Sequence, residues 1–503
     1  MAAFGRNGLG RVQTMNPQDT TILISAILLL VDLAIRIAAL IIIPRDRKPT
    51  AAMAWLLAIF FIPFVGIFFF LLLGSPKLPR KRREKQQEIN RMISDAAPTS
   101  DLASNRDSWP PWFARVVALN RHLGAVPMAG GNNATLIGDY NASIDAMAAD
   151  IDTATEFVHV EFYIVSFDDT TKHFFAAMEA AVERGVRVRV LLDHIASIRT
   201  VGHTETFAEL DRIGATWSFT LPVQPFKGKY QRPDLRNHRK IVVVDGRVAY
   251  LGSQNLIDRS YLAEKNLKRG LQWQELVTRV TGPVVGGINA VFLSDWYSET
   301  DELLNELVPV DTVWRDTSPE ALDCQVVPSG PGFEGENNLR LFLALLYSAQ
   351  ERIIITSPYF VPDEAMMYAI TSARQRGLDV QLFVSEIGDQ ASVYHAQRSY
   401  YGALLEAGVR IWLYPAPYIL HSKHFSIDDD VAVIGSSNMD IRSFILNFEV
   451  SLMVRGRPFV GRMREVEAGY REISRELTLM DWNTEPRSAT VFDGLARLTS
   501  ALQ

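Results

Sequence analysis

Residues 237–255 read NHRKIVVVDGRVAYLGSQN, and this stretch says more about the chain than any other. His238, Lys240 and Asp245 form the pattern H-x-K-x-x-x-x-D, with an apolar run between the lysine and the aspartate. After a gap of six residues the chain turns through Gly252-Ser253-Gln254-Asn255. One such pattern is weak by itself, because a histidine near a lysine is most often a surface pair or a core contact.

The pattern occurs a second time. His421, Lys423 and Asp428 have the same spacing, and after the same gap of six residues the turn Gly435-Ser436-Ser437-Asn438 follows. The same residue types therefore recur in one order at two places, each across a β-rich run. The chain contains an internal repeat, and each copy carries a histidine, a lysine, an aspartate and an asparagine.

The surroundings of the two motifs repeat as well. We predict strands at 157–165 and 186–193 around a helix at 171–184 in the first half, and strands at 353–361 and 378–385 in the second. Alternating strands and helices predict an α/β fold in which helices cover a mostly parallel sheet.

An insertion in the first half interrupts the match just before the motif. It brings a group of basic residues to the mouth of the first H-x-K: Lys227, Lys229, Arg232 and Arg236. The insertion is either a solvated loop or a clamp for a phosphate or a lipid headgroup.

With 503 residues the chain is longer than one typical domain, so we expect more than one. We expect a membrane hairpin with a basic juxtamembrane segment at 1–90, a linker at 91–108, a first half at 109–315, and a second half with a C-terminal tail at 316–503. The predicted tail helix has an apolar face made of Val491, Leu495, Leu498 and Leu502. We expect this face to pack on the body, with the membrane surface as the alternative.

Two apolar segments precede the repeats. Residues 20–43 and 51–73 are each long enough to cross a hydrocarbon core of about 30 Å, so we predict a transmembrane hairpin. Asp32 and Arg36 share one face of the first segment, where we expect a structural ion pair. If Arg36 instead reaches the interface, this segment is shallow or re-entrant.

Charge divides the chain and orients it. The net charge is -6, but residues 1–90 hold twelve Lys and Arg against five Asp and Glu, which gives +7 there and -13 elsewhere. The basic cluster at 77–85 predicts a multi-pass anchor with the body in the cytoplasm. The basic residues in the loop 44–49 count against this orientation.

Substitution at a phosphodiester is the chemistry that fits the repeated residues. An imidazole serves as a nucleophile toward phosphorus or as a general acid and base, and two imidazoles can divide these roles. Lysine and asparagine side chains suit phosphate oxygens. The expected phosphate-binding residues are Lys240, Lys423, Asn255 and Asn438.

Each imidazole also needs an acceptor that fixes its tautomer. Glu275 and Glu449 lie on predicted strands after the two motifs and can accept from the imidazole N–H. The single cysteine, Cys324, excludes a disulfide framework and a thiolate metal cluster. With no nucleotide-binding or zinc pattern in the sequence, we expect neither a metal nor a cofactor.

The doubled motif with its G-S-x-N turn resembles the phospholipase D superfamily. The resemblance narrows to bacterial cardiolipin synthases through EFYIVSFDD from Glu161, VVPSGPG from Val326, SPYFVPDE from Ser357, SSNMDIRSFILNFEV from Ser436 and the apolar N-terminal segments. It covers almost the whole chain. Glu275 stands where the family usually has Asp, and His424 is an extra histidine that we expect to pack in the core.

The resemblance implies two phospholipase D-like α-β-α sandwich halves that share one active site in a bacterial inner-membrane protein. It further implies transfer between two phosphatidylglycerol molecules, which yields cardiolipin and glycerol through a phosphohistidine, without a metal. The first-half histidine is generally the nucleophile in the family, so His238 takes this role and His421 acts as acid and then base. Asp245 and Asp428 belong to the motif as structural partners away from the phosphate.

Three alternatives stay open. One is a phospholipase D-type hydrolase, one is a cardiolipin synthase that uses phosphatidylethanolamine as one donor, and one is a non-catalytic lipid-binding scaffold. The acidic body and the apolar segments disfavour nucleic acid as a partner. The sequence leaves a homo-oligomer open.

Overall fold

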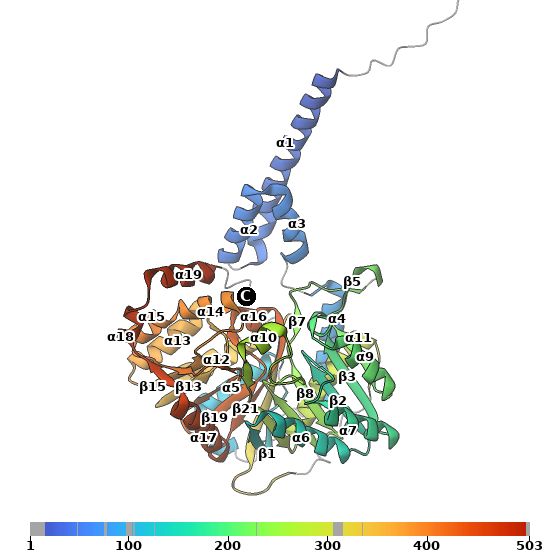
Figure 1. Ribbon diagram of the computed structural model, residues 1–503, viewed down its shortest axis with the longest axis vertical. Coiled ribbons are helices and arrows are strands. Elements are labelled where there is room, and N and C mark those ends of the chain that lie inside the picture. Colours follow the sequence, from blue (N-terminus) through green and yellow to red (C-terminus); the bar gives the residue numbers. More distant parts are fainter. Residues whose placement is uncertain are drawn as a thin grey trace, which may run out of the picture. The chain divides into compact units, whose positions relative to one another are not determined.

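The computed structural model describes residues 16–47, 49–74, 78–96, 103, 106–124, 126–227, 229–304, 315–333 and 335–498. The chain divides into two compact units, Met1–Pro76 and Lys77–Gln503, which we call the N-terminal unit and the main unit. Figure 1 shows the elements of each.

The N-terminal unit consists of apolar helices of unequal length, α1 (Pro17–Ile42), α2 (Pro49–Phe61) and α3 (Pro63–Leu73). Among the described residues only one helical span, Thr20–Arg45, is long and apolar enough to cross a membrane. The prediction of one helix over 51–73 is wrong, because Pro63 ends α2. A proline lacks the N–H of the helical ladder, and Ile62 before it adopts φ -137°.

Helices α2 and α3 turn back on each other, so the end of α3 lies close to the start of α2. The Arg47 guanidinium, just before α2, donates to the Gly74 carbonyl just after α3, with Nε at 3.0 Å and Nη2 at 2.7 Å. One continuous helix would separate these residues by about 40 Å. At the turn, a Cβ on Gly66 would lie 2.7 Å from the Ala58 carbonyl oxygen, so only glycine permits this close approach.

The ion pair expected in α1 is present. The Arg36 Nε lies 2.8 Å from the Asp32 carboxylate, and the guanidinium also lies 5.4 Å from the centre of the Phe60 ring near the end of α2. Pairing with Asp32 and contact with Phe60 both lower the cost of Arg36 in an apolar environment.

The main unit is built on one mixed sheet, which has sixteen strands within the described part of the chain. Its order is β22-β16-β15-β13-β18-β19-β21-β12-β1-β11-β9-β8-β2-β3-β4, and β7 pairs with β21. The first repeat supplies β1 (Ala129–Ile137), β2 (Phe157–Phe162), β3 (Arg187–Asp193), β4 (Thr216–Thr220), β8 (Lys240–Val244), β9 (Val248–Gly252) and β11 (Val277–Thr281). The second supplies β12 (Leu322–Ser329), β13 (Arg352–Thr356), β15 (Asp379–Ser385), β16 (Arg410–Tyr414), β18 (His424–Ile427), β19 (Val431–Gly435), β21 (Asn447–Arg455) and β22 (Arg475–Leu477).

The two repeats have the same strand order and meet at an antiparallel pair, β1 with β12. The predicted α/β class with two repeated halves is confirmed, but the sheet is not mostly parallel. Within the main sheet, parallel pairs occur at β2-β3-β4 and at β13-β15-β16. The strands of the two motifs form hairpins, β8 with β9 and β18 with β19, and such short connections require antiparallel pairing.

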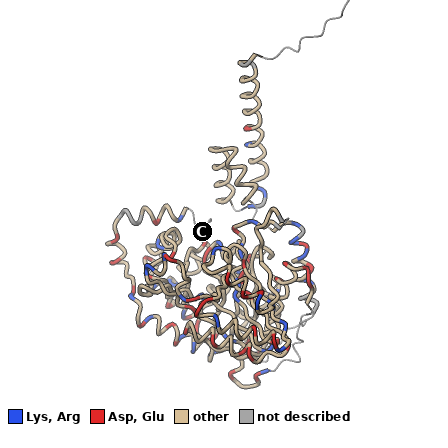
Figure 2. The backbone as a smooth tube through the Cα atoms, turned by 45° about the vertical axis from the view of Figure 1, so that its right-hand side comes forward, with Lys and Arg blue, Asp and Glu red and all other residues tan. Residues whose placement is uncertain are grey.

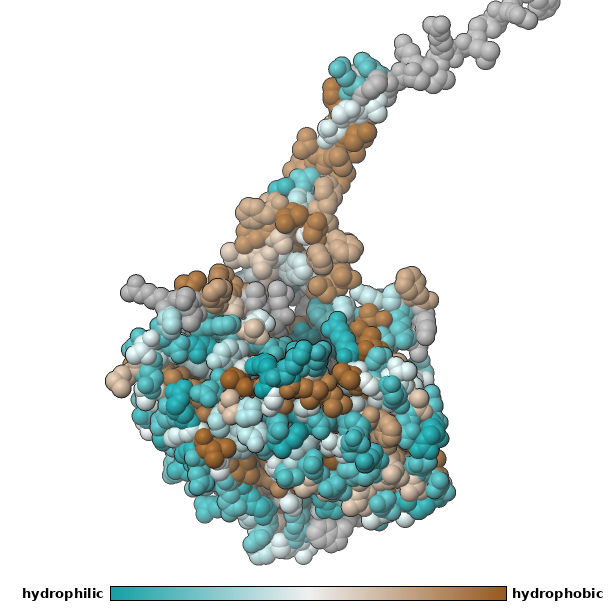
Figure 3. All heavy atoms as spheres, viewed as in Figure 1, coloured by the Kyte–Doolittle hydropathy of each residue, from teal (hydrophilic) through white to brown (hydrophobic). Residues whose placement is uncertain are grey.

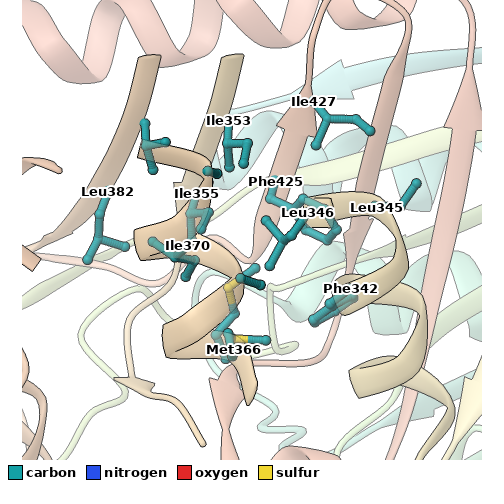
Figure 4. Close-up of a cluster of buried hydrophobic side chains, with 14 of the residues drawn as sticks. Phe342, Leu345, Leu346, Ile353, Ile355, Met366, Ile370, Leu382, Phe425 and Ile427 are labelled. Atoms are coloured by element: carbon teal, nitrogen blue, oxygen red, sulfur yellow. The ribbon is translucent and has the colours of Figure 1, made fainter. Parts of the chain in front are cut away.

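Helices cover both faces of the sheet, so its strands are buried on both sides. In β8, Val242 and Val244 pack with α6 (Tyr140–Asp152) and α7 (Lys172–Glu183), while Ile241 and Val243 pack with α11 (Val284–Thr300) and α17 (Arg457–Ile473). In the second repeat, α12 (Asn337–Ser348) and α13 (Glu364–Gln375) take the place that α6 and α7 have in the first. Figure 4 shows Phe342 and Leu346 of α12 against Phe425 of β18.

The remaining described helices of the main unit surround this core. They are α4 (Arg80–Ala96), α5 (Pro111–His122), α8 (His194–Arg199), α9 (His203–Arg212), α10 (Glu264–Arg269), α14 (Ala391–Arg398), α15 (Tyr401–Glu406), α16 (Ile441–Ile445), α18 (Leu479–Asn483) and α19 (Arg487–Leu498). The basic helix α4 packs on α11, where Gln86 donates to Ser294 at 2.9 Å and Arg82 pairs with Glu299. The basic segment expected to belong with the membrane hairpin is thus part of the main unit. Figure 2 shows charges of both signs scattered over the main unit and few on α1–α3.

Candidate active site

Two short ladders between the repeats position the motif histidines. Strand β7 (Arg236–Asn237) directly precedes His238 and pairs with the start of β21, with Asn237 opposite Phe448. Strand β17 (Tyr418–Leu420) directly precedes His421 and pairs with β10 (Gln272–Gln274) of the first repeat, with Leu420 opposite Gln274. One residue further along each ladder, His238 therefore lies beside Glu449, and His421 lies beside Glu275.

The histidine–glutamate pairs are crossed between the repeats. The Nδ1 atom of His238, from the first repeat, lies 3.0 Å and 3.1 Å from the carboxylate oxygens of Glu449 in the second. The Nδ1 atom of His421 lies 2.7 Å from Oε1 of Glu275 in the first repeat. A carboxylate only accepts, so each Nδ1 carries the proton and each Nε2 keeps its lone pair. The motif histidine of each repeat thus takes its carboxylate partner from the other repeat.

Burial controls the protonation of this group. Burial lowers the pKa of His238 to about 4 and also lowers the pKa of His421, although the neighbouring glutamates oppose the shift. Burial alone would raise the pKa of Glu449 and of Glu275, but their histidines hold both below the usual value. Near neutral pH the arrangement is a neutral imidazole donating to a carboxylate on each side.

The two motif lysines are buried and lie close enough to influence both histidines. Burial lowers the pKa of Lys240 to about 7 and that of Lys423 to about 8. Lys423 lowers the pKa of His238, and Lys240 lowers the pKa of His421, so the charges of the two motifs act on one another. Each ammonium donates to the carbonyl of its own motif histidine, at 2.5 Å for Lys240 and 2.6 Å for Lys423.

The two asparagines of the turns differ in their contacts. Asn255 accepts from the Ile164 N–H at 3.1 Å, and its amide donates to the Tyr261 hydroxyl at 2.8 Å. The side-chain oxygen of Asn438 is buried and has no hydrogen-bond partner within the part of the chain that the structure describes. The free atom of Asn438 is thus an acceptor, which suits a hydroxyl donor of a ligand, whereas the Asn255 amide donates to Tyr261.

The two motif aspartates lie away from the imidazoles and stabilise the backbone. Asp245 accepts from the N–H groups of Thr155, Glu156 and Phe157 at 2.8–2.9 Å. Asp428 accepts in the same way from the N–H groups of residues 350–352. Both residues have a left-handed backbone, with φ 51° and 48°, which a short polar side chain tolerates.

The residues that the prediction missed include a tyrosine beside each histidine. The Tyr163 ring meets the His238 ring edge-on at 5.0 Å between centres, and the Tyr359 ring meets His421 at 6.1 Å. A signal existed in the sequence, since EFYIV from Glu161 and SPYFV from Ser357 place these tyrosines at matching positions.

A third tyrosine was missed because its signal is a difference between the repeats. Tyr261, in DRSY, corresponds to Phe444 in DIRSF. Its hydroxyl connects Asn255 to Glu275, to which it donates at 3.4 Å. Tyr261 has a left-handed backbone with φ 58°, and so does the next residue, Leu262, with φ 54°. Bulky residues rarely adopt this conformation, so the surrounding structure holds Tyr261 in place against local strain.

The insertion and the extra histidine have local roles. Arg236 is buried and pairs with Asp193 at 3.0 Å, and Arg232 pairs with Asp234, so neither is a free phosphate clamp. The side chains of Lys227 and Lys229 lie outside the described residues. His424 is buried beside Glu467, 3.8 Å away, and burial lowers its pKa to about 3. These contacts agree with a packing role for His424.

Comparisons with known proteins match both repeats and part of the N-terminal unit. A family model described as "Cardiolipin synthase, PLD-like domain" matches residues 147–290 and 342–467, one region in each repeat. A model of the N-terminal region of phospholipase D-nuclease proteins matches residues 34–75.

Individual relatives cover nearly the whole chain. "Cardiolipin synthase A" of Pectobacterium carotovorum is 32% identical over 451 residues, which is 88% of this chain and 91% of the relative. The protein of the same name from Proteus mirabilis is 29% identical and covers 92% of this chain and 94% of its own length. The crystal structure of phosphatidylserine synthase from Haemophilus influenzae matches 78% of this chain and 99% of its own, with a TM-score of 0.59 at 13% identity, which shows a shared fold. The chain belongs to the cardiolipin synthase family of proteins with phospholipase D-like domains.

Proposed function

We propose that this membrane-associated cardiolipin synthase transfers a phosphatidyl group from one phosphatidylglycerol to another through a phosphohistidine on His238. The observation that carries the proposal is the pair of crossed histidine–glutamate contacts, which leaves two unprotonated Nε2 atoms in one buried, lysine-lined site. Two such imidazoles suit a double displacement at phosphorus, because one can bond to phosphorus while the other moves a proton.

In the first step, His238 Nε2 attacks the phosphorus of the first phosphatidylglycerol. The P–O bond to the headgroup glycerol breaks, and His421 gives a proton to the departing oxygen. His421 must be protonated at this moment, although burial lowers its pKa. The anionic phosphodiester opposes this shift, because a negative charge near an imidazole raises its pKa.

In the second step, His421 takes the proton of a glycerol hydroxyl on the second phosphatidylglycerol. The resulting oxygen attacks phosphorus, the N–P bond to His238 breaks, and cardiolipin forms. Glycerol is the other product. Lys240, Lys423 and Asn438 hold the phosphate oxygens in both steps, with the ammonium groups balancing the charge. Asn255 contributes through the amide that Tyr261 orients. The route needs no metal or cofactor.

The assignment of His238 as the nucleophile has support in its pKa of about 4, which keeps it unprotonated over the physiological range. The pairing of each imidazole with an acid from the other half fits the proposed division into halves at 109–315 and 316–503.

For the membrane topology we propose one crossing, by α1, and a re-entrant α2–α3 pair. Because Arg47 and Gly74 lie together, the loop 44–49 and the cluster 77–85 are on the same side. Their three and six basic residues then add up, and the positive-inside rule puts the main unit in the cytoplasm. A cysteine at Thr14 in intact cells tests this. One crossing exposes it to a membrane-impermeant maleimide outside, whereas two crossings hide it.

Product analysis tests the function directly. Purified protein in vesicles of radiolabelled phosphatidylglycerol, with a chelator present, is compared with His238→Ala. We expect cardiolipin and an equal amount of glycerol from the unchanged protein and neither from the variant. Phosphatidic acid as the main product would make the protein a hydrolase that uses water as acceptor. Cardiolipin that forms only when phosphatidylethanolamine is added, with release of ethanolamine, would identify that lipid as a donor.

A further inference from the structure

Helix α19 faces outward with its apolar side. Four large hydrophobic side chains of this helix are mostly exposed: Val491 at 60%, Phe492 at 62%, Leu495 at 56% and Leu498 at 80%. They lie at helical spacing on one side, and Figure 3 shows the apolar surface along α19. The expected packing of this face on the body is therefore wrong for the described residues of the tail, while Leu502 lies outside them.

The opposite side of α19 is held on the main unit by polar contacts. Asp493 is 2% exposed, lies 2.7 Å from His395 Nδ1 on α14, and also pairs with Arg398 at 3.4 Å. Ala496 packs against the hydrophobic core on the same side. A surface helix in water normally has the reverse arrangement, so these contacts fix α19 with its apolar face toward an apolar partner.

A second apolar projection stands on the insertion of the first repeat. Phe226 is fully exposed in the connection between β5 (Val223–Gln224) and β6 (Lys229–Tyr230). Figure 1 shows β5 and α19 at the same end of the main unit. Two separate elements of the fold thus expose large hydrophobic side chains at one end.

The base of the insertion adjoins both the membrane connection and the site. Leu221 and Leu235 bury Leu78, where the chain enters the main unit from the N-terminal unit, and they form one cluster with Phe448. The carbonyl of Phe448 accepts from the His238 N–H at 2.9 Å. The insertion therefore lies between the entry of the chain and the nucleophile.

The geometry points to a docking surface for the phospholipid bilayer, formed by α19 and the Phe226 tip. The apolar face would enter the headgroup boundary, as interfacial helices do, and would hold the mouth of the site against the lipid. A second copy of the chain is the poorer occupant. Four side chains on one short helix fall well short of the roughly 800 Å² per partner of a standard protein interface. The reason for docking rests on the proposed function, in which the substrate is a phospholipid. The exposed apolar surface itself does not depend on that function.

Site-specific labelling of the full chain in vesicles tests the surface. Phe492→Cys, Leu498→Cys and Phe226→Cys each receive a fluorophore, and Glu183→Cys at the exposed end of α7 is the matched control. Cys324 can stay, because it is fully buried. Nitroxide groups on the lipid chains should quench the three test positions and not residue 183, while aqueous iodide should show the opposite order.

Each other outcome overturns the proposal. If iodide quenches residues 492 and 498 as strongly as residue 183, the face lies in water. If the labels are shielded from iodide only at a high protein-to-lipid ratio, a second copy of the chain covers the face. Neither readout depends on catalysis, so a failure of the proposed activity is seen separately from a failure of docking.

An activity measurement gives an independent readout. Phe492→Ser with Leu495→Ser should lower the rate on phosphatidylglycerol in vesicles about tenfold, since two large side chains lose their apolar environment. In detergent mixed micelles the rate should match the unchanged protein, because substrate then reaches the site without docking. Ile473→Ser, at the end of α17, removes a similarly exposed side chain and should change neither rate. An equal loss in vesicles and micelles would contradict the docking role.

Discussion

The two repeats of the main unit share seven strands in the same order, and the second adds β22, yet their sites differ in the residues around each motif. In the first motif the residue between histidine and lysine is Arg239, which pairs with Asp295 and donates to the Glu449 carbonyl at 3.1 Å. In the second it is Ser422, which accepts from the Tyr470 hydroxyl at 3.3 Å. The repeated scaffold therefore places two alike imidazoles in two unlike environments.

The two repeats also differ at a position after the G-S-x-N turn. Tyr261 of the first repeat ties Asn255 to Glu275, the acid of His421, whereas the corresponding Phe444 packs in the core. The two repeats form similar frames, and the proposed mechanism assigns the two histidines separate duties within them. The predictions below test how far these duties are separate.

The largest effect is expected at the histidines. An activated donor with a leaving group of low pKa needs no acid, so His421→Ala should still form a phosphohistidine from it. His238→Ala should not, and both variants should lose at least about 10⁴-fold in cardiolipin formation. Rapid quenching with phosphorus-labelled donor measures the intermediate. Label trapped in His238→Ala and absent from His421→Ala would reverse the roles.

The crossed acids come next. Glu449→Gln should slow phosphohistidine formation about 10²–10⁴-fold with either donor, because His238 loses the acceptor that fixes its tautomer. Glu275→Gln should slow the reaction with phosphatidylglycerol by a similar factor but leave the activated donor nearly unaffected. The same labelling experiment measures both variants. The opposite pattern would mean that each acid acts within its own repeat.

The pH dependence concerns the lysines. With pKa values of about 7 for Lys240 and about 8 for Lys423, the free enzyme loses positive charge as pH rises from 7 to 9. We expect kcat/KM to fall over this range, since a neutral amine binds phosphate more weakly. In Lys423→Arg, which keeps its charge, the fall should begin from a lower activity but be shallower. An unchanged slope would assign the alkaline limb to other groups.

Tyr261→Phe gives the first repeat the residue type that the second has. The variant loses the hydroxyl that accepts from Asn255 at 2.8 Å and donates to Glu275 over the longer distance of 3.4 Å. Its loss should lower kcat about fivefold and change KM little, as expected for about 1 kcal/mol. Tyr250→Phe is the matched control, because this tyrosine lies away from the site. Its hydroxyl donates to the Ala146 carbonyl at a distance of 2.8 Å. It should leave kcat unchanged. Equal losses in both variants would indicate a general effect on packing.

The smallest catalytic effect is expected at the motif aspartates. Asp245→Asn and Asp428→Asn should lower the free energy of unfolding by about 1–3 kcal/mol and leave kcat of the folded enzyme unchanged. Asparagine fits the left-handed backbone at both positions. Reaction of buried Cys324 with a thiol dye during heating reports unfolding. Loss of kcat without loss of stability would place these aspartates in the reaction.

The effect at Asp245 should depend on pH. Burial alone would raise the pKa of this carboxylate, but the backbone N–H groups of residues 155–157 hold it below the usual value. Its contribution to stability is therefore present above the unfolded pKa of about 3.9 and is lost as pH falls through the folded pKa. The difference in free energy of unfolding between the unchanged protein and Asp245→Asn should therefore become smaller in acid.

Much of this molecule was predictable from the spacing of a few residues. The doubled motif identified the repeat, and the apolar runs gave strands β2, β3 and β15 to within three residues of their observed bounds, whereas the strand predicted at 353–361 ends at Thr356 in β13. The mostly parallel sheet was a wrong prediction, because the short turn after Val244 makes a hairpin. The break at Pro63 was visible in the sequence, since a proline inside an apolar run ends a helix.

The crossing of the acids could not be predicted in the same way. It depends on β7 and β10, which have two and three residues, too few to show any periodicity. Their partners lie far away in the chain, and register between such strands is a tertiary property. The identity of the acids was within reach of the sequence, but their assignment to histidines was not.

The crossed pairs also set a rule for any smaller version of this protein. A lone first repeat would hold His238 without Glu449, and a lone second repeat would hold His421 without Glu275. A one-repeat enzyme on this plan works only as a dimer in which each copy lends its carboxylate to the other. Fusing the two copies into one chain fixes their concentration and lets the imidazoles specialise, but neither copy can be discarded afterwards.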